Sequence, residues 1–514
     1  MKAPLLSLLL TITLAAAAVA AVRLPALISD NMVLQQDLPA NVWGWADPGE
    51  KVTVTFADKS TETTADAAGQ WRVRLPVLTS GTVGELTVVG TNTLTVKNVA
   101  VGEVWVCSGQ SNMEWSVRGA MNATEEISGG NFPLIRHFAV ARAPHAEPQE
   151  DTKGQWEICT PQTVGNFTAV GYSFARELHR TMKVPVGLIH SSWGGTAAEL
   201  WTPWPILQGD SDFKSITASW EKVVAEYPEA KAKYDAELAT WTDAEKQAKE
   251  AGTPIPPKPK KPKGGDALDR PASLYNGMIA PLLPYTIRGF TWYQGESNAS
   301  RAQQYRKLFP TMIQSWRAAW QQPEAPFLFV QLANFMQRRD EPSDTDWARL
   351  REAQTAALEL PHTGMAVAID VGDAKDIHPR DKQTVGKRLA LSALATVYYR
   401  DFDFSGPMFG GAQIEGEKVR LTLRHSEGLK TADGGKVTGF AIAGDDRKFV
   451  WADAEISGDH VIVSSPEVKT PASVRYAWAD NPACNLINAA GLPAAPFRTD
   501  TWPVGAAPVK PAGQ

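Results

Sequence analysis

The run VPVGLIHSSWGG (184–195) helps to set the fold class, because it is one of five apolar runs that are nearly continuous. The other four are AVGEVWVCSG (100–109), IRGFTWYQGES (287–297), APFLFVQLAN (325–334) and GMAVAIDVGD (364–373). Such runs are typical of parallel strands buried on both faces. Helical patterns lie beside them, at 174–183, 303–322, 347–360 and 380–399. This alternation predicts a doubly wound α/β sheet, whose ligands bind beyond the carboxyl ends of the strands.

β patterns flank this central region. Residues 21–100 contain alternating runs such as VTVTF (52–56), and residues 401–514 return to the same pattern. We therefore expect an α/β domain at 101–400 between N- and C-terminal β-sandwich domains. The segment 208–270 interrupts the α/β domain with a charged helix or helix pair and then a Pro/Lys-rich loop. Its KPKKPK motif favours a solvated linker, with anionic lipid or polysaccharide binding as the alternative.

Composition and charge argue against a nucleic-acid partner. The 514 residues include 51 basic and 56 acidic side chains, which gives a formal net charge of −5 and no basic field to attract phosphates. Residues 1–20 carry one Lys, an apolar run and small residues that end in Ala18-Val19-Ala20. This pattern predicts a signal peptide, with a membrane anchor as the alternative. We expect a secreted or periplasmic protein without a stable membrane span.

A candidate nucleophile follows the first apolar run. CSGQSNM (107–113) places Ser111 in a turn at the carboxyl edge of the predicted sheet, although a plain serine helix cap gives the same pattern. Serine needs a base within hydrogen-bond reach. Of the eight histidines, only His190 and His378 lie just beyond apolar runs of the α/β domain. We predict His378 as the base, because it has acidic neighbours that can orient an imidazole, and His190 as a structural histidine.

Two further turns supply candidates for an oxyanion hole. Gly194 and Gly195 follow the second run, where glycine lets a backbone N–H approach a substrate closely. Gln294 and Asn298 follow the third run, and either can donate from a side-chain amide. Chain reversal alone also explains glycines in turns. Polar turns after four strands of one sheet nevertheless favour a catalytic edge.

Four motifs of the α/β domain carry a family resemblance: VWVCSGQSNMEW, GLIHSSWGGTAAELW, FTWYQGESN and DIHPRDKQTVGKRLA. With them the sequence resembles the sialate O-acetylesterases, secreted carbohydrate esterases of the SGNH-hydrolase fold. The stretches 27–54 and 476–500 are similar as well, so the likeness spans most of the chain outside 208–270. The resemblance implies Ser111 as nucleophile and His378 as general base. It also implies an oxyanion hole formed by the Ser111 amide, Gly194 or Gly195, and Gln294.

One position departs from the family pattern. SGNH hydrolases carry the orienting acid three residues before the histidine, where this chain has Lys375. Asp376, Asp373 or a backbone carbonyl remain candidates to orient His378, and we favour Asp376. The predicted substrate contacts are Gln110, Asn112, Trp193, Glu296 and Asn298.

The tryptophans divide into two groups by position. Trp316 and Trp320 stand four apart on a predicted helix, which is the spacing of core residues. Another four lie beside the predicted catalytic turns, where indole faces can stack on a sugar. These are Trp115, Trp193, Trp201 and Trp292.

Together these observations predict a serine esterase that removes O-acetyl groups from sialic acid or a related sugar. The nearest alternative is an acetyl-xylan or other polysaccharide esterase, because the motifs report acyl transfer and not the sugar. A non-catalytic carbohydrate-binding protein is more remote. We expect no metal or organic cofactor, since the sequence contains no H-E-x-x-H or C-x-x-C pattern. Cys107, Cys159 and Cys484 permit at most one disulfide, and the sequence leaves the pairing and the oligomeric state open.

Overall fold

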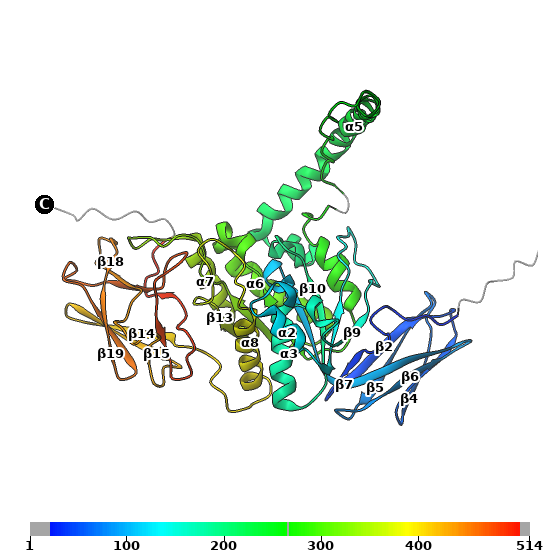
Figure 1. Ribbon diagram of the computed structural model, residues 1–514, viewed down its shortest axis with the longest axis horizontal. Helices are drawn as coiled ribbons and strands as arrows, with labels where there is room; N and C mark the ends of the chain where they lie inside the picture. The colour runs from blue at the N-terminus through cyan, green and yellow to red at the C-terminus, as the bar shows by residue number, and fades with distance from the viewer. Residues whose placement is uncertain (1–20, 265–266, 504–514) are drawn as a thin grey trace, which may run out of the picture.

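The computed structural model describes residues 21–264 and 267–503 (Figure 1), so the predicted signal segment 1–20 lies outside the described residues. Its central sheet has the strand order β13-β12-β11-β7-β10-β8-β9. These strands are β7 (Thr93–Gly109), β8 (Phe132–Ala139), β9 (Trp156–Cys159), β10 (Val186–Ser192), β11 (Gly289–Tyr293), β12 (Phe327–Gln331) and β13 (Thr363–Val367). Neighbouring strands are parallel except at the edge, where β9 runs antiparallel to β8. The five predicted strands form one parallel block, which confirms the mixed α/β class.

Helices cover both faces of this sheet. The helices are α1 (Ser111–Glu114), α2 (Ala123–Ser128), α3 (Ala169–Met182), α4 (Trp204–Gln208), α5 (Lys214–Ala251), α6 (Ala302–Trp320), α7 (Asp346–Ala356) and α8 (Lys382–Thr396), of which α5 projects away from the sheet. Trp105 of β7 packs against Phe174 of α3, with 5.1 Å between ring centroids. Trp292 of β11 pairs with Ser108 and so points to the opposite face, because side chains alternate along a strand. There it packs against Trp316 of α6 at 5.7 Å.

The sequence patterns did not predict strands β8 and β9, and for β8 the structure gives a physical reason. Arg136 and His137 interrupt the apolar pattern of β8, yet both side chains are buried. The Arg136 guanidinium donates to the Asn31 carbonyl at 3.0 Å and to Oδ1 of Asn98 at 3.1 Å. A buried cation is tolerated here because these oxygens replace its water.

The N-terminal β region shares a strand with the central sheet. Its strands are β1 (Val33–Gln35), β2 (Pro39–Trp45), β3 (Lys51–Phe56), β4 (Lys59–Thr64), β5 (Gln70–Val77) and β6 (Val83–Val89). The first part of β7 pairs with β6 and β1, and its second part pairs with β10 and β11. The domain boundary expected at residue 100 therefore falls inside one continuous 17-residue strand.

The C-terminal β region lies on the opposite side of the molecule from the N-terminal one (Figure 1). Its first sheet has the order β14-β15-β20-β19 and its second the order β18-β17-β21-β23, and β16 pairs with β22. The bounds are β14 (Met408–Glu415), β15 (Lys418–Arg424), β16 (Lys430–Thr431), β17 (Phe440–Ala443), β18 (Val450–Trp451), β19 (Asp453–Ser457), β20 (His460–Ser464), β21 (Ser473–Tyr476), β22 (Leu486–Ile487) and β23 (Phe497–Arg498). Arg351 of α7 joins this region to the sheet, since its guanidinium donates to the Ala479 carbonyl at 2.7 Å and the Leu332 carbonyl at 2.8 Å.

The insertion forms one long helix rather than a helix pair. Helix α5 has 38 residues and projects from the body of the molecule as an arm (Figure 1). The indole N–H of Trp241 donates to the Pro256 carbonyl at 2.7 Å, so part of the Pro/Lys-rich stretch folds back on the helix. Across the described residues no helix is both long and apolar enough to span a bilayer, and all three cysteines are free thiols.

Candidate active site

Ser111, His378 and Asp376 form one chain of hydrogen bonds. Ser111 Oγ lies 2.9 Å from Nε2 of His378, and Nδ1 of His378 lies 3.1 Å from Oδ1 of Asp376. The backbone N–H of His378 also donates to this Oδ1 at 2.9 Å, and that bond is the main reason why the pKa of Asp376 lies below its ordinary value. Asp373 instead accepts the backbone N–H of Lys375 at 2.7 Å and shapes the turn. The geometry thus favours Asp376 over Asp373.

The ends of two strands bring Ser111 into position. Strand β7 ends at Gly109, whose φ of +133° favours glycine, and a Cβ there would lie 2.2 Å from the Tyr293 carbonyl of β11. The next N–H, that of Gln110, donates to the same carbonyl at 3.0 Å. The chain therefore turns sharply over β11, and Ser111 begins α1.

His378 reaches Ser111 from the loop between β13 and α8. The Trp115 ring stacks on its imidazole, with 5.0 Å between centroids and 24° between planes. Stacking on one side and the hydrogen bond to Asp376 on another limit the rotation of the imidazole ring. Its Nε2 is thereby kept directed at the serine hydroxyl.

A buried network lies directly behind this pair. Lys382 Nζ donates to Oδ1 of Asn112 at 2.5 Å, and Nδ2 of Asn112 donates to Oε1 of Glu296 at 2.6 Å and to the Ile377 carbonyl at 3.2 Å. Burial lowers the pKa of Lys382 to about 7 and raises that of Glu296 above its ordinary value. Because Asn112 follows Ser111 and Ile377 precedes His378, the network fixes the spacing of these two residues.

Both predicted oxyanion glycines lie near Ser111. A Cβ on Gly194 would lie 3.2 Å from the Cβ of Ser111, and open space surrounds the corresponding position on Gly195. The Gly194 N–H donates to Oε2 of Glu114 at 2.5 Å, and Glu114 also forms an ion pair with Arg142. The Glu114 carboxylate thus accepts the Gly194 N–H, which an oxyanion in the hole would otherwise accept.

Gln294 has a different place from the one predicted. It is fully buried, and its Nε2 donates to the Thr196 carbonyl at 3.2 Å and to Oδ1 of Asn298 at 2.7 Å. Asn298 is buried as well, and its Nδ2 donates to Glu199 at 2.9 Å. An amide nitrogen has two hydrogens, and both of Gln294 are used within the protein. Gln294 and Asn298 therefore hold the turn after β10 and do not face an oxyanion or a sugar.

The other predicted substrate contacts divide in the same way. Gln110 is buried, and its Oε1 accepts the backbone N–H of Ser297 at 3.3 Å. Asn112 and Glu296 are bonded to each other in the network described above. Only Trp193 remains at the surface in this set, with the Arg142 guanidinium 5.6 Å from its ring.

Two of the four tryptophans considered for stacking on a sugar lie in the core. Trp201 and Trp292 are fully buried, and their rings pack edge to face at 6.1 Å in the core. Trp115 and Trp193 are half-buried and remain available to a ligand. Proximity in sequence to a catalytic turn did not separate the two pairs, because Trp201, at the end of a 3₁₀ helix, and Trp292, on β11, pack into the core.

Comparison with known proteins now identifies the family. A family model described as carbohydrate esterase, sialic acid-specific acetylesterase, matches residues 101–251 and 260–395. The chain belongs to this esterase family. Mouse sialate O-acetylesterase is 32% identical over 92% of this chain and 94% of its own, and the human protein is 29% identical over 92% of each. A carbohydrate acetylesterase of known structure from Xanthomonas citri is 40% identical over 94% of this chain and all of its own, with a TM-score of 0.80.

The protein is thus a carboxylic ester hydrolase, and the resemblance seen in the sequence is confirmed. The esterase has a cavity of about 530 Å³ that shares Trp115, the residue stacked on His378, with the site. Its wall includes Glu114, Trp115, Arg142, Asn166, His190 and Ser192. Burial lowers the pKa of His190 to about 4, and its Nε2 lies 2.6 Å from the Ser192 hydroxyl, which agrees with a structural histidine.

Sequence reasoning missed three charged residues of the site. Glu114 and Lys382 stand inside the quoted motifs, three residues after Ser111 and four after His378 respectively, so their position near the candidates was a usable signal. Arg142 follows β8, a strand that the patterns did not predict. Nothing in the local sequence therefore indicated its place beside the cavity.

Proposed function

We propose that this esterase removes O-acetyl groups from sialic acid or a related sugar through an acetyl-serine intermediate. The observation that carries the proposal is the hydrogen-bonded chain from Ser111 through His378 to Asp376. Nucleophile, base and orienting acid stand in the order that acyl transfer requires.

The first half of the proposed reaction acylates the enzyme. His378 Nε2 takes the Ser111 proton as Oγ attacks the acetyl carbonyl carbon. The tetrahedral intermediate collapses, its bond to the sugar oxygen breaks, and His378 returns the proton to that oxygen. The deacetylated sugar leaves, and Ser111 carries the acetyl group.

The second half repeats the same steps with water. His378 accepts a proton from a water molecule as it attacks the acetyl-serine, and acetate leaves when Oγ regains its proton. Asp376 stabilises the imidazolium that forms in both halves. The Ser111 amide and the amides of Gly194 and Gly195 are our candidates to hold the oxyanion, and Glu114 must release the Gly194 N–H for that amide to serve.

A serine-to-alanine variant tests the proposal. Ser111→Ala should release acetate from O-acetylated sialic acid at less than about one thousandth of the wild-type rate, while its circular dichroism and melting temperature stay the same. Mass spectrometry of the quenched wild-type protein should find the acetyl group on the peptide that contains Ser111. Full activity of the folded variant would disprove the assignment.

An acetyl-xylan or other polysaccharide esterase remains the second candidate for the substrate. The relative from Xanthomonas citri, which is named only as a carbohydrate acetylesterase, favours keeping it. Acetate release from O-acetylated sialic acid, acetylated xylan and acetylated mannan, measured side by side, separates the two. The sugar with the highest kcat/KM identifies the substrate.

We also propose an SGNH-hydrolase fold with flanking β-sandwich domains, and export through a signal peptide at residues 1–20. The apolar run and the Ala18-Val19-Ala20 pattern support export. N-terminal sequencing of the protein recovered from the medium or periplasm should begin after about Ala20. Recovery of the intact N-terminus in the cytoplasm would contradict export.

A further inference from the structure

A second cavity lies at the junction of the α/β region and the C-terminal β region. It has a volume of about 340 Å³. One wall is the loop after β12, with Glu341 and Asp344, and the other comes from β18, β21 and the residues around them. The C-terminal side supplies Arg447, Lys448, Phe449, Trp451, Trp478 and Trp502. These six residues lie outside the segments matched by the family model.

Trp451 offers a fixed aromatic surface in this cavity. It is 45% exposed, an unusual value for the largest apolar side chain. Its indole N–H donates to the Asp340 carbonyl at 2.6 Å, which anchors the ring edge to the loop after β12. The ring is therefore held in place before any ligand arrives, and a ligand that stacks on it loses less entropy.

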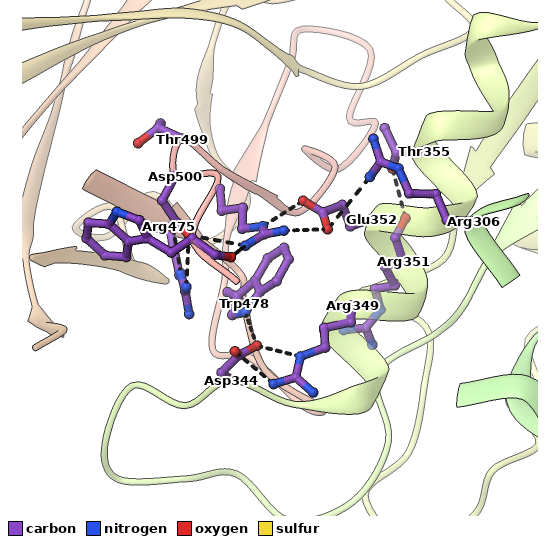
Figure 2. A network of polar contacts seen from close by, with 12 residues as sticks. Arg306, Asp344, Arg349, Arg351, Glu352, Thr355, Arg475, Trp478, Thr499 and Asp500 are labelled. Atoms are coloured by element: carbon purple, nitrogen blue, oxygen red, sulfur yellow. Dashed lines mark hydrogen bonds and ion pairs between the residues drawn. The ribbon is translucent and has the colours of Figure 1, made fainter. Parts of the chain in front are cut away.

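The same cavity has a wall of paired side chains, and Figure 2 shows the contacts of Arg475 with Asp500 and of Trp478 with Asp344. The Arg475 guanidinium lies 4.0 Å from the ring centroid of Phe449 and 5.4 Å from that of Trp478, and it pairs with Asp500 at 3.0 Å. Trp478 donates through Nε1 to Asp344 at 3.1 Å. Such a wall of stacked rings and paired charges forms a pocket without a conformational change.

The chemistry of the wall suits a sugar. Aromatic faces present flat apolar surface to the C–H face of a pyranose, and polar groups around them can meet its hydroxyls. Lys448 is exposed, and the Arg447 guanidinium lies 5.3 Å from the Trp502 ring. Donors thus stand beside an aromatic surface, the combination that fixes both the position and the orientation of a polar ring.

The loop that forms the first wall of the junction cavity also contacts the loop that carries His378. Asn334 lies in this loop, and its Oδ1 accepts the Gly372 N–H at 2.7 Å. Gly372 lies in the loop between β13 and α8, which carries His378. Phe335 and Asp373 form a parallel bridge next to it, so the two loops run side by side from the carboxyl ends of β12 and β13.

We propose that the junction cavity binds sugar residues of an oligosaccharide whose acetylated residue lies at Ser111. This inference rests on the proposed function and extends it, because it assigns the esterase to glycan chains rather than to free monosaccharides. Binding at a second subsite on one ligand strengthens attachment without a change in chemistry. Trp451 should therefore affect KM for oligosaccharides and leave kcat unchanged.

The test compares Trp451→Ala with Tyr399→Ala, which removes another exposed aromatic side chain outside the cavity. The substrates are acetylated xylohexaose, O-acetylated sialyllactose and their acetylated monosaccharides. We expect Trp451→Ala to raise KM about tenfold for at least one oligosaccharide, with kcat and monosaccharide KM unchanged. Tyr399→Ala should match the wild type throughout.

Binding to an inactive background gives the second measurement. Calorimetry with Ser111→Ala should show binding of the same oligosaccharide, and Ser111→Ala/Trp451→Ala should bind it about tenfold more weakly. Equal KM values and equal affinities with and without Trp451 would overturn the inference while the esterase function stands. Failure of the wild type to release acetate from any of the sugars would instead overturn the proposed function.

Discussion

Replacing Lys382 by methionine tests the buried network behind Ser111 and His378. Lys382 is fully buried, and burial lowers its pKa from 10.5 to about 7. Between these two values the unfolded chain binds more protons than the folded one, so this group makes stability rise with pH. The pKa difference of 10.5 − 7 = 3.5 units lowers the free energy of unfolding by about 5 kcal/mol at low pH. About 2 kcal/mol of this loss is recovered between pH 7 and 9.

Urea unfolding at pH 7, 8 and 9, followed by tryptophan fluorescence, measures this term. The wild type should gain about 2 kcal/mol over this range relative to Lys382→Met. The control is Lys375→Met, an exposed lysine near His378, which should follow the wild type. Loss of the contact to Asn112 should also lower kcat roughly tenfold. Parallel pH curves for the wild type and Lys382→Met would refute the reasoning.

Three further substitutions test single contacts. Asp376→Asn should lower kcat roughly 100-fold. The expected loss is smaller than for a buried triad acid, because the Asp376 side chain is 42% exposed. A loss below threefold would mean that another group orients His378. Gly109→Ala should lower the melting temperature by several degrees and abolish activity, whereas Gly411→Ala, with open space at its Cβ, should not. Trp115→Ala should reduce kcat about tenfold and Trp115→Phe should restore most of it, since the phenyl ring can still stack on His378.

The sequence was sufficient for the central strands because both of their faces are buried. Strands β10, β11, β12, β13 and the second part of β7 are nearly all apolar, and their short length between turn residues favours a strand over a buried helix. Strand β8 was missed because Arg136 is buried there with carbonyl partners from the N-terminal region. Asn31 is 105 residues away in the chain and Asn98 is 38 residues away, so no local pattern reports them.

The same distinction separates the residues of the site. Ser111 and His378 were predictable because each follows a strand end, and parallel strands bring their carboxyl ends to one edge. The motifs placed Glu114 and Lys382 near the candidates, but the roles of Glu114, Arg142 and Lys382 depend on which charges face them in three dimensions. A lysine next to a predicted catalytic loop is ordinarily solvated. Only the structure shows that Lys382 is buried and donates to Asn112.

The amide side chains of the motifs have hydrogen-bond partners within the protein. An amide both donates and accepts, so Gln110 and Asn112 are as able to bind a neighbouring turn as a sugar. Here they bind the turn: Gln110 accepts from Ser297 N, and Asn112 donates to Glu296. The motifs GQSNM and QGESN are therefore two halves of one hydrogen-bonded unit. The two motifs together indicate the esterase better than either alone, because the second motif holds the first in place. The proposed nucleophile of the unit is Ser111.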